Sequence, residues 1–344
     1  MPRKRMQRRT LPHPWFGPLR LLRHCRAWRV APDGLAIEIR PLDEIGADAV
    51  VGLAASYYPA GHDARRREYL DWLYNRNPFG QGRIVAALER GLLIGMMGLI
   101  PFRLRCDDGT FIAHMVVNVL THPRHRTKSL FVKMIRVAKH ECDEKGEWLI
   151  GHPNDAAYPG WKRNGMVFQP GYDMKWIAPL RPLPLRGFRR RADVAPNELP
   201  CLDFGPLLQW QSNVRQPVIA ADAAFIEWRF FRHPTRSYRV GSLRQGNRVL
   251  GYWVRRAFRP MVDLIVDWQG GDFWKAGPPA SLWRPSLIAW PVAGVEANPV
   301  PVPRRLWALP RMHKYYRFFA TPPAQVDGSP RQWHLLTLAA TDFG

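Results

Sequence analysis

The stretch from Phe111 to Lys139, FIAHMVVNVLTHPRHRTKSLFVKMIRVAK, decides how the rest of the chain is interpreted. Its apolar run from Val116 to Leu120 predicts a buried strand, and Pro123 cannot continue a central β-ladder. From Ser129 onward, apolar residues recur at helical spacing with cations between them. The stretch therefore predicts a strand that turns directly into a helix.

A corner of this kind suits a phosphate group. The first amides of a helix point outward without intrahelical partners, and the macrodipole favours negative charge there. Three cations, Arg124, Arg126 and Lys128, add positive charge to the corner. A solvated basic loop would have the same composition, so these residues alone leave both interpretations open.

The surrounding sequence resembles the GNAT superfamily of N-acyltransferases, in which a strand is followed by R-x-x-G-x-G/A at a helix start. Residues 121–131, THPRHRTKSLF, are similar to the T-H-P-x-y-R-g-k-G-l-f version found in GNAT-like proteins of polysaccharide biosynthesis clusters. Thr127 and Ser129 stand where glycines are usual. Glycine at such positions permits unusual backbone angles and close approach to a phosphate. Residues 150–166 resemble the family's next strand and short helix.

This resemblance implies an α/β (α+β) fold with a mixed central sheet flanked by helices. It also implies acetyl-CoA or another acyl-CoA as the cofactor. Strand amides at a distorted point would hold the pantetheine arm, and the helix start would hold the pyrophosphate. The residues implied for cofactor binding are Val119, Leu120, Thr121, Arg124, Arg126, Thr127, Lys128, Ser129, Leu130 and Asn154.

The chemistry implied by the resemblance is direct attack of an amine on a thioester, in which the enzyme positions both reactants and moves protons. Strand alternation predicts that His114 and Asn118 share one face. His114 is a candidate general base because histidine titrates near working pH, although a structural histidine fits equally well. Tyr158, near the start of the short helix, is the candidate proton donor to the thiolate. His152 and Asp155 are further base candidates.

No metal site is expected. The pairs His140 and Cys142, and His122 and His125, have no third ligand at a suitable spacing.

A repeated pattern predicts that the chain is duplicated. At 344 residues, the length fits two domains. Residues 69–72 (YLDW) and 225–228 (FIEW) are followed at equal distances by a proline and then by a glycine on an apolar strand. The segment after residues 261–268 lacks the R-x-x-G-x-G helix start. We therefore predict a degenerate second module without a cofactor of its own, closing the acceptor side of the first.

Four regions are expected along the chain. They are a basic amino-terminal arm at residues 1–34, a GNAT-like acyl-CoA-binding domain at 35–180, a Pro/Arg-rich linker at 181–206 and a degenerate second GNAT-like domain at 207–344. In the first domain, the expected element order is β-α-α-β-β-β-α-β-α.

Bulk composition limits the setting of the protein. Four scattered cysteines without a C-x-x-C pair favour a reducing cytoplasm. The longest uncharged apolar run, at 91–102, is too short to span a bilayer. The net charge is +23, and the arginines of the amino-terminal arm alternate with aromatic residues. Such an arm fits peripheral contact with an anionic membrane better than nucleic-acid binding, and a packed or disordered basic arm fits equally.

Three functions are compatible with these features. The first is a cytoplasmic N-acyltransferase acting on a small-molecule or lipid-linked amine, such as an amino sugar or a lipid-linked saccharide in envelope or exopolysaccharide synthesis. The second is a Fem-like aminoacyl-tRNA-dependent peptidyl transferase, which the basic charge favours and the T-H-P-x-x-R corner disfavours. The third is a non-catalytic GNAT-like scaffold, which the departures at Asn118, Thr127, Ser129 and Trp161 favour. The substrate class comes from the resemblance alone, because a fold does not fix a function.

Overall fold

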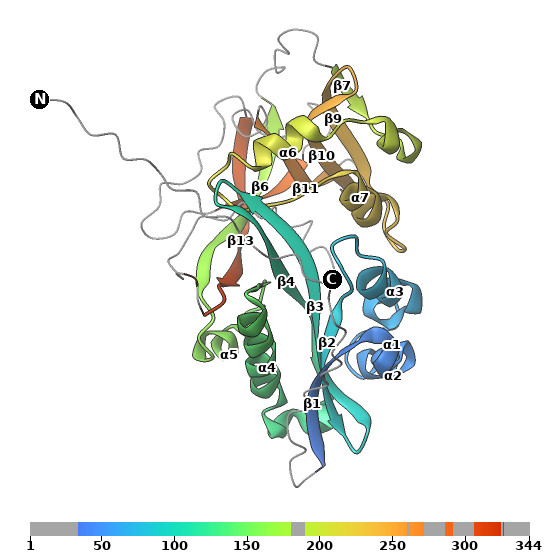
Figure 1. The fold of residues 1–344 in the computed structure, drawn as a ribbon, viewed down its shortest axis with the longest axis vertical. Coiled ribbons are helices and arrows are strands. Elements are labelled where there is room, and N and C mark those ends of the chain that lie inside the picture. The colour runs from blue at the N-terminus through green and yellow to red at the C-terminus, as the bar shows by residue number, and fades with distance from the viewer. Residues whose placement is uncertain are drawn as a thin grey trace, which may run out of the picture.

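Figure 1 shows a computed structural model of the chain. It describes residues 34–179, 190–259, 262–271, 286–291, 306–324 and 326. Residues 1–33 of the expected basic arm and 180–189 of the expected linker lie outside this description. Among the described helices, none combines the length and apolar character needed to cross a bilayer.

The first module follows the predicted order of elements, except that three helices and not two follow the first strand and a further strand ends the module. It contains β1 (Leu35–Pro41), α1 (Leu42–Ile45), α2 (Ala47–Ala55), the 3-10 turn η1 (Asp63–Arg65), α3 (Arg67–Asn75), β2 (Arg83–Glu89), β3 (Leu92–Cys106), β4 (Gly109–Thr121), the 3-10 turn η2 (Pro123–Lys128), α4 (Leu130–Lys145), β5 (Trp148–Gly151), α5 (Tyr158–Arg163) and β6 (Phe168–Pro179).

Local sequence explains where these elements begin and end. In α4, the buried residues Leu130, Met134, Ala138 and Cys142 recur every four positions, so one face of the helix packs on the sheet. Gly146 ends the helix in a left-handed conformation with φ 67°, which glycine adopts without a steric penalty.

Helices cover both faces of the first module's sheet (Figure 1), with α1, α2 and α3 on one face and α4 and α5 on the other. The core between α4 and the sheet includes Met134, Ile135 and Leu149, whereas Tyr69, Leu70 and the opposite sheet face belong to a larger core shared with the second half. The two halves are therefore packed through α3 and not merely tethered.

The second half contains a second set of elements. They are β7 (Arg190–Asp193), the 3-10 turn η3 (Pro196–Cys201), α6 (Gly205–Gln211), β8 (Val218–Ile219), α7 (Ala223–Ile226), the π-helical turn η4 (Glu227–Phe231), β9 (Arg239–Gln245), β10 (Arg248–Arg259), β11 (Val262–Gly270), β12 (Ser286–Pro291) and β13 (Leu306–Thr321).

The second set repeats the first at the offset of 156 residues that separates Trp72 from Trp228. With this offset, β2 falls on β9, and α3 falls on α7 together with η4. The parallel pairing of β4 with β5 recurs as the parallel pairing of β11 with β12. The predicted duplication is confirmed. The stretch 269–274, where the second module was expected to lack a phosphate-binding helix start, is described only to residue 271, and residues 272–285 lie outside the described residues.

The expected linker at 181–206 is too long. At the same offset, β7 is the counterpart of β1, and it pairs with β9 from Arg190–Arg244 to Asp193–Gly241. The residues that follow β7 bury Val194, Leu199 and Phe204 in the core. Two of the prolines that suggested a linker, Pro196 and Pro206, lie in the first turns of short helices, where a missing amide hydrogen costs little.

The modules exchange their last strands. Among the described residues, thirteen strands form one sheet, which apart from β8 has the order β1-β2-β3-β4-β5-β13-β6-β12-β11-β10-β9-β7. Thus β13 of the second module pairs with β5 of the first, and β6 of the first module pairs with β12 of the second. At the centre β6 and β13 pair with each other in antiparallel orientation.

Two equivalent tryptophans meet between the modules. Trp72 Nε1 donates to the carbonyl of Trp228 at 2.9 Å, and Trp228 Nε1 donates to the carbonyl of Trp72 at 3.0 Å. The rings stack with centroids 5.0 Å apart and planes inclined by 18°. This reciprocal contact marks a local two-fold axis that relates α3 to α7 and η4.

The second module buries charge where the first is apolar. Arg229, the counterpart of Leu73, has no exposed surface, and its guanidinium lies 5.7 Å from the ring centroid of Trp72. Asp267 is equally buried and accepts a 2.5 Å hydrogen bond from the Tyr252 hydroxyl. Burial raises the pKa of Asp267 to about 7, although the bond from Tyr252 and the charge of Arg229 oppose the increase.

Candidate active site

The cavity that can hold a cofactor opens where β4 and β5 diverge. These parallel strands pair only from Ala113–Trp148 to Met115–Ile150. Beyond this point, a cavity of about 610 Å³ lies between them. The lining residues used below are Tyr57, Tyr58, His62, Asn118, Val119, Thr121, Arg126, Ser129, Leu130, His152, Asn154, Trp161 and Phe319.

A β-bulge at Asn118 shapes one wall of the cavity. Asn118 has φ 48°, and the pairing of β4 with β3 shifts register beside it, between Met96 and Gly98. Because β5 has already diverged, the backbone of β4 after the bulge faces the cavity and not a neighbouring strand. Such a strand edge offers amides to an extended ligand, as expected for the distorted point placed at Val119 to Thr121.

The bulge also corrects the predicted alternation of β4. The Asn118 side chain lies near the hydroxyl of Tyr74, which comes from α3 on the face opposite α4. A Cβ at Gly98 would lie 2.2 Å from the Tyr74 hydroxyl, so the glycine is needed for this close approach. His114 faces the α4 side instead, so the two polar residues do not share a face. The extra residue of a bulge reverses the alternation, which the sequence pattern alone did not reveal.

The predicted phosphate corner is present. Ser129 has left-handed angles, φ 54° and ψ 29°, immediately before α4 begins at Leu130. Its carbonyl accepts the first helical hydrogen bond, from the amide of Lys133 at 3.2 Å. The amides that precede Lys133 in the first turn are the ones that an α-helix leaves without intrahelical acceptors. Arg126 lines the same cavity, with its guanidinium 5.8 Å from the centroid of the Tyr57 ring.

The structure brings together most of the residues implied for cofactor binding. Those that line the cavity are Val119, Thr121, Arg126, Ser129, Leu130 and Asn154. Leu120 is buried in the core with 3% of its surface exposed, and Arg124 is exposed but does not line the cavity. Thr127 and Lys128 belong to η2, but their side chains lie outside the described parts of the chain. The Asn154 side chain accepts a hydrogen bond from the Ala157 amide at 2.8 Å and so helps to fix the segment before α5.

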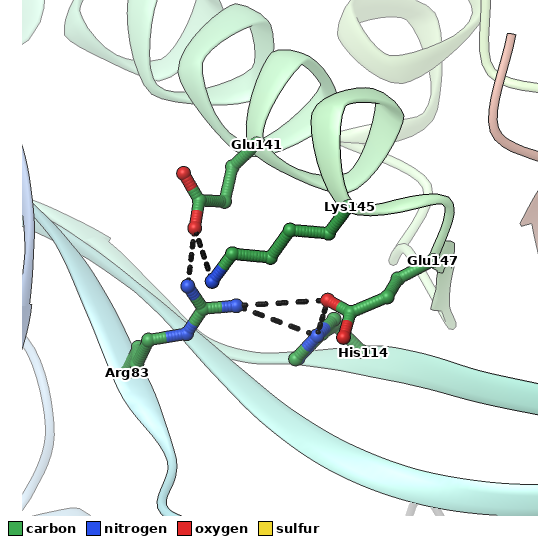
Figure 2. A network of polar contacts seen from close by, with 5 residues as sticks. All are labelled: Arg83, His114, Glu141, Lys145 and Glu147. Atoms are coloured by element: carbon green, nitrogen blue, oxygen red, sulfur yellow. Dashed lines mark hydrogen bonds and ion pairs between the residues drawn. The ribbon is translucent and has the colours of Figure 1, made fainter. Parts of the chain in front are cut away.

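His114 lies outside the cavity, in the polar network of Figure 2. Its Nε2 donates to Glu147 at 2.6 Å, and the Arg83 guanidinium contacts both Glu147 and Glu141. Burial would raise the pKa of Glu147, but the hydrogen bond from His114 and the charge of Arg83 outweigh burial and lower it. Lys145 completes the network through Glu141 at 2.6 Å. This placement gives His114 a structural role, because its hydrogen bond joins β4 to the segment after α4. It does not support the predicted role of His114 as a general base.

Tyr158 also lies outside the residues that line the cavity. Its ring packs edge-on against Phe168 with centroids 4.7 Å apart, and the Arg317 guanidinium lies 4.4 Å from its centroid. Arg317 in turn forms an ion pair with Asp155. The predicted proton donor is therefore part of a surface cluster that joins α5 to β13, and Asp155 is occupied by the same cluster.

Three residues that the sequence analysis did not select form the opposite wall of the cavity: Tyr57, Tyr58 and His62. The rings of Tyr58 and His62 are stacked, 3.6 Å apart and inclined by only 2°. Burial raises the pKa of Tyr58, with Tyr57 adding to the effect. Burial lowers the pKa of His62, with Arg236 adding and Asp63 opposing.

His152, at the end of β5, is the second imidazole of the cavity. Its burial lowers its pKa to about 3, although a hydrogen bond with the backbone of Arg317 opposes the shift. Phe319 of β13 also lines the cavity, and its ring lies 4.7 Å from that of Trp161. The second module therefore contributes to the cavity through Phe319, on the strand that pairs with β5 of the first module.

The chain is thus an α/β protein with a mixed sheet, in which two parallel strands diverge around a cavity beside a helix start. Residues 38–165 match the sequence model of a family described as an acetyltransferase (GNAT) domain. Over these residues, the chain is therefore similar to the GNAT acetyltransferases.

Solved structures agree with this fold over most of the chain. A probable N-acyltransferase from Enterococcus faecalis V583 has a TM-score of 0.58 at 12% identity, and the match covers 84% of this chain and 73% of that one. A GCN5-related N-acetyltransferase from Anabaena variabilis has a TM-score of 0.59, with the same identity and the same coverage. Eis1 from Mycobacterium abscessus has a TM-score of 0.51 at 15% identity, with 83% and 73% covered. No curated protein sequence matches the chain. At these identities, the solved structures establish the fold and nothing more.

Proposed function

We propose that the protein is an N-acyltransferase that moves an acyl group from acetyl-CoA, or another acyl-CoA, to an amine. One observation carries this proposal. A single cavity joins the corner formed by Arg126 and Ser129 to the wall formed by Tyr58 and His62. The first end suits a pyrophosphate, and the second is an aromatic, hydrogen-bonding wall suited to an acceptor.

The residues of the cavity fit an acyl-CoA. The left-handed Ser129 directs the chain into α4, so that the unpaired amides of the first turn and the Arg126 guanidinium can hold phosphate oxygens. The open edge of β4 after Asn118 can bind the extended pantetheine arm through backbone hydrogen bonds. When bound, acyl-CoA supplies an acyl group already activated as a thioester.

The chain then orients the acceptor and supplies the proton that the leaving thiolate takes up. The acceptor nitrogen forms the new C–N bond, the C–S bond breaks, and the sulfur leaves as a thiolate that takes up a proton. The raised pKa of Tyr58 keeps its hydroxyl protonated, so we assign Tyr58 as the donor to that thiolate. Backbone amides of β4 near Val119 polarise the thioester carbonyl.

The proton of the amine has no strong base to receive it among the described cavity residues. These residues include no carboxylate, and both imidazoles, His62 and His152, have lowered pKa values. The acceptor must therefore react as a neutral amine, already deprotonated from its ammonium form. After the attack, its nitrogen loses a further proton to water. We infer that the rate rises with pH through the pKa of the acceptor and not through that of an enzyme group near 6.5.

We propose amino sugars, free or lipid-linked, as the acceptor class. This part of the proposal rests on the similarity of residues 121–131 to the GNAT-like proteins of polysaccharide biosynthesis clusters. A lipid-linked acceptor would suit the basic residues within 1–33, which could bring the cytoplasmic enzyme to an anionic membrane.

Calorimetry with acetyl-CoA, followed by a radiolabel transfer assay with amino sugars, tests the proposal. We expect one saturable site per chain and transfer to an amine. As a matched pair, Arg126→Glu should abolish binding, whereas Arg124→Glu, exposed and outside the cavity lining, should reduce it much less. The absence of saturable binding by the wild-type protein would overturn the assignment.

A further inference from the structure

One charged contact connects the second module to the acceptor wall. Arg236, in the segment between η4 and β9, places Nη2 3.1 Å from Oδ2 of Asp63. Both side chains are largely buried, with 15% and 14% of their surfaces exposed. Asp63 begins η1 and directly follows His62, which lines the cavity. Arg236 of the second module is thus connected to the acceptor wall through Asp63.

The turn that carries His62 is short. Between α2 and α3, the only regular element in the structure's description of residues 56–66 is the three-residue turn η1. Ala64 is buried, and its amide donates to His62 Nδ1 at 3.2 Å. Arg65 donates from Nη1 to the carbonyl of Tyr58 at 3.1 Å, which closes the segment on itself. These bonds shape the turn, and the ion pair of Asp63 connects it to the second module.

The hydrogen bond from Ala64 also determines the state of the His62 ring. Because Nδ1 accepts a hydrogen bond, the neutral imidazole carries its proton on Nε2. Stacking on Tyr58 then fixes the plane in which this N–H can point. The position of His62 therefore decides where the acceptor wall offers a hydrogen-bond donor.

We propose that Arg236 is a positioning residue for acceptor binding: through Asp63, it fixes the turn that presents His62 and Tyr58 to the cavity. This inference rests on the proposed function, because it takes the Tyr58–His62 wall as the acceptor side. A largely buried pair held at 3.1 Å is more than a surface ion pair, because removing one partner leaves the other charge without compensation. Neither Arg236 nor Asp63 lines the cavity beside Ser129 and Arg126, so the pair should affect the acceptor more than the cofactor.

The kinetic test compares Arg236→Ala, Arg236→Lys and a control, Arg232→Ala. Arg232 lies four residues earlier in the chain, and its exposed ion pair with Glu227 borders a different groove. We expect Arg236→Ala to lower kcat/KM for the acceptor by roughly tenfold or more, since small misplacements of a site cost large factors. The calorimetric Kd for CoA should stay within about twofold, and Arg236→Lys should recover much of the loss. The control should match the wild type.

A second measurement requires neither turnover nor a known acceptor. The imidazole NMR signals of His62, assigned with His62→Gln, should shift in Arg236→Ala and in Asp63→Asn, while those of His140, exposed on α4, stay in place. Unchanged His62 signals would overturn the positioning role, as would a parallel loss of CoA affinity. Failure of the wild type to bind CoA would instead refute the proposed function, while the NMR result would still decide the role of Arg236.

Discussion

The reciprocal tryptophan contact gives a quantitative test of the two-fold arrangement. Replacing Trp72 by Phe keeps an aromatic ring but removes the Nε1–H that donates to the Trp228 carbonyl at 2.9 Å. Trp72 and Trp228 are 2% and 5% exposed, so water cannot easily replace the lost donor. An unsatisfied buried acceptor costs about 1–3 kcal/mol. A weakened stack adds part of the roughly 0.5–1.5 kcal/mol that such aromatic pairs contribute.

We therefore expect Trp72→Phe to lower the free energy of unfolding by about 2–4 kcal/mol, measured by urea denaturation at equilibrium. Trp228→Phe should cost a similar amount, because the two contacts are nearly equivalent. In the double variant, each carbonyl loses its own donor, so the effects should add to within about 1 kcal/mol of coupling through the shared stack. A loss below about 0.5 kcal/mol, or one variant much more costly than the other, would refute this reasoning.

Three further predictions follow from the cavity and the buried acid. Ser129 has a left-handed backbone conformation that costs a residue with a side chain about 1–2 kcal/mol, and Ser129→Gly should relieve this strain. We therefore expect Ser129→Gly to raise both Tm and CoA affinity, whereas the control Ser129→Ala should raise neither. A lower Tm for the glycine variant would contradict this expectation. Arg126→Ala should weaken calorimetric CoA binding by about 1–3 kcal/mol at nearly constant Tm, and unchanged affinity would remove Arg126 from the phosphate corner. The folded pKa of Asp267, about 7, lies above that of an unfolded aspartate, so its protonated form stabilises the fold fully at low pH and this contribution disappears as pH rises through 7. Asp267→Asn should remove this decline, seen as a smaller difference in unfolding free energy between pH 5 and pH 8, and identical slopes in both proteins would exclude the effect.

Local patterns in the sequence were sufficient for the strand, corner and helix of residues 111–139. Their signals, β-branched runs, a proline and helical spacing, act over a few residues. The duplication was equally accessible, because residues 72 and 228 keep their roles at one offset. The bulge at Asn118 could not be predicted from the sequence, because a single residue with a positive φ does not change the periodic pattern of apolar residues. It was this bulge that separated Asn118 from the face of His114.

The misplaced catalytic residues depended on contacts between distant parts of the chain. His114 is committed to Glu147, 33 residues later, and Tyr158 is covered by Arg317 of β13. No local pattern predicts such partners. The acceptor wall was missed for a similar reason. Tyr58 and His62 lie between helices in the sequence, and they reach the cavity only when α2 is packed over β4. A pair of adjacent tyrosines followed by a proline and a histidine was the available signal.

The exchange of strands has a consequence for how the protein folds during its synthesis on the ribosome. The last pair that joins β5 to β13 is Leu149 with Thr321, so the β5 edge of the nascent amino-terminal sheet stays unpaired until residues 319–321 have emerged. Bare edges are templates for unwanted pairing, and pairings so distant in sequence form slowly. We therefore expect the sheet of the first module to be completed only after the second module has been synthesised, although early domains usually fold before later ones. If the two halves were expressed as separate chains, we expect each to need the other to complete its sheet.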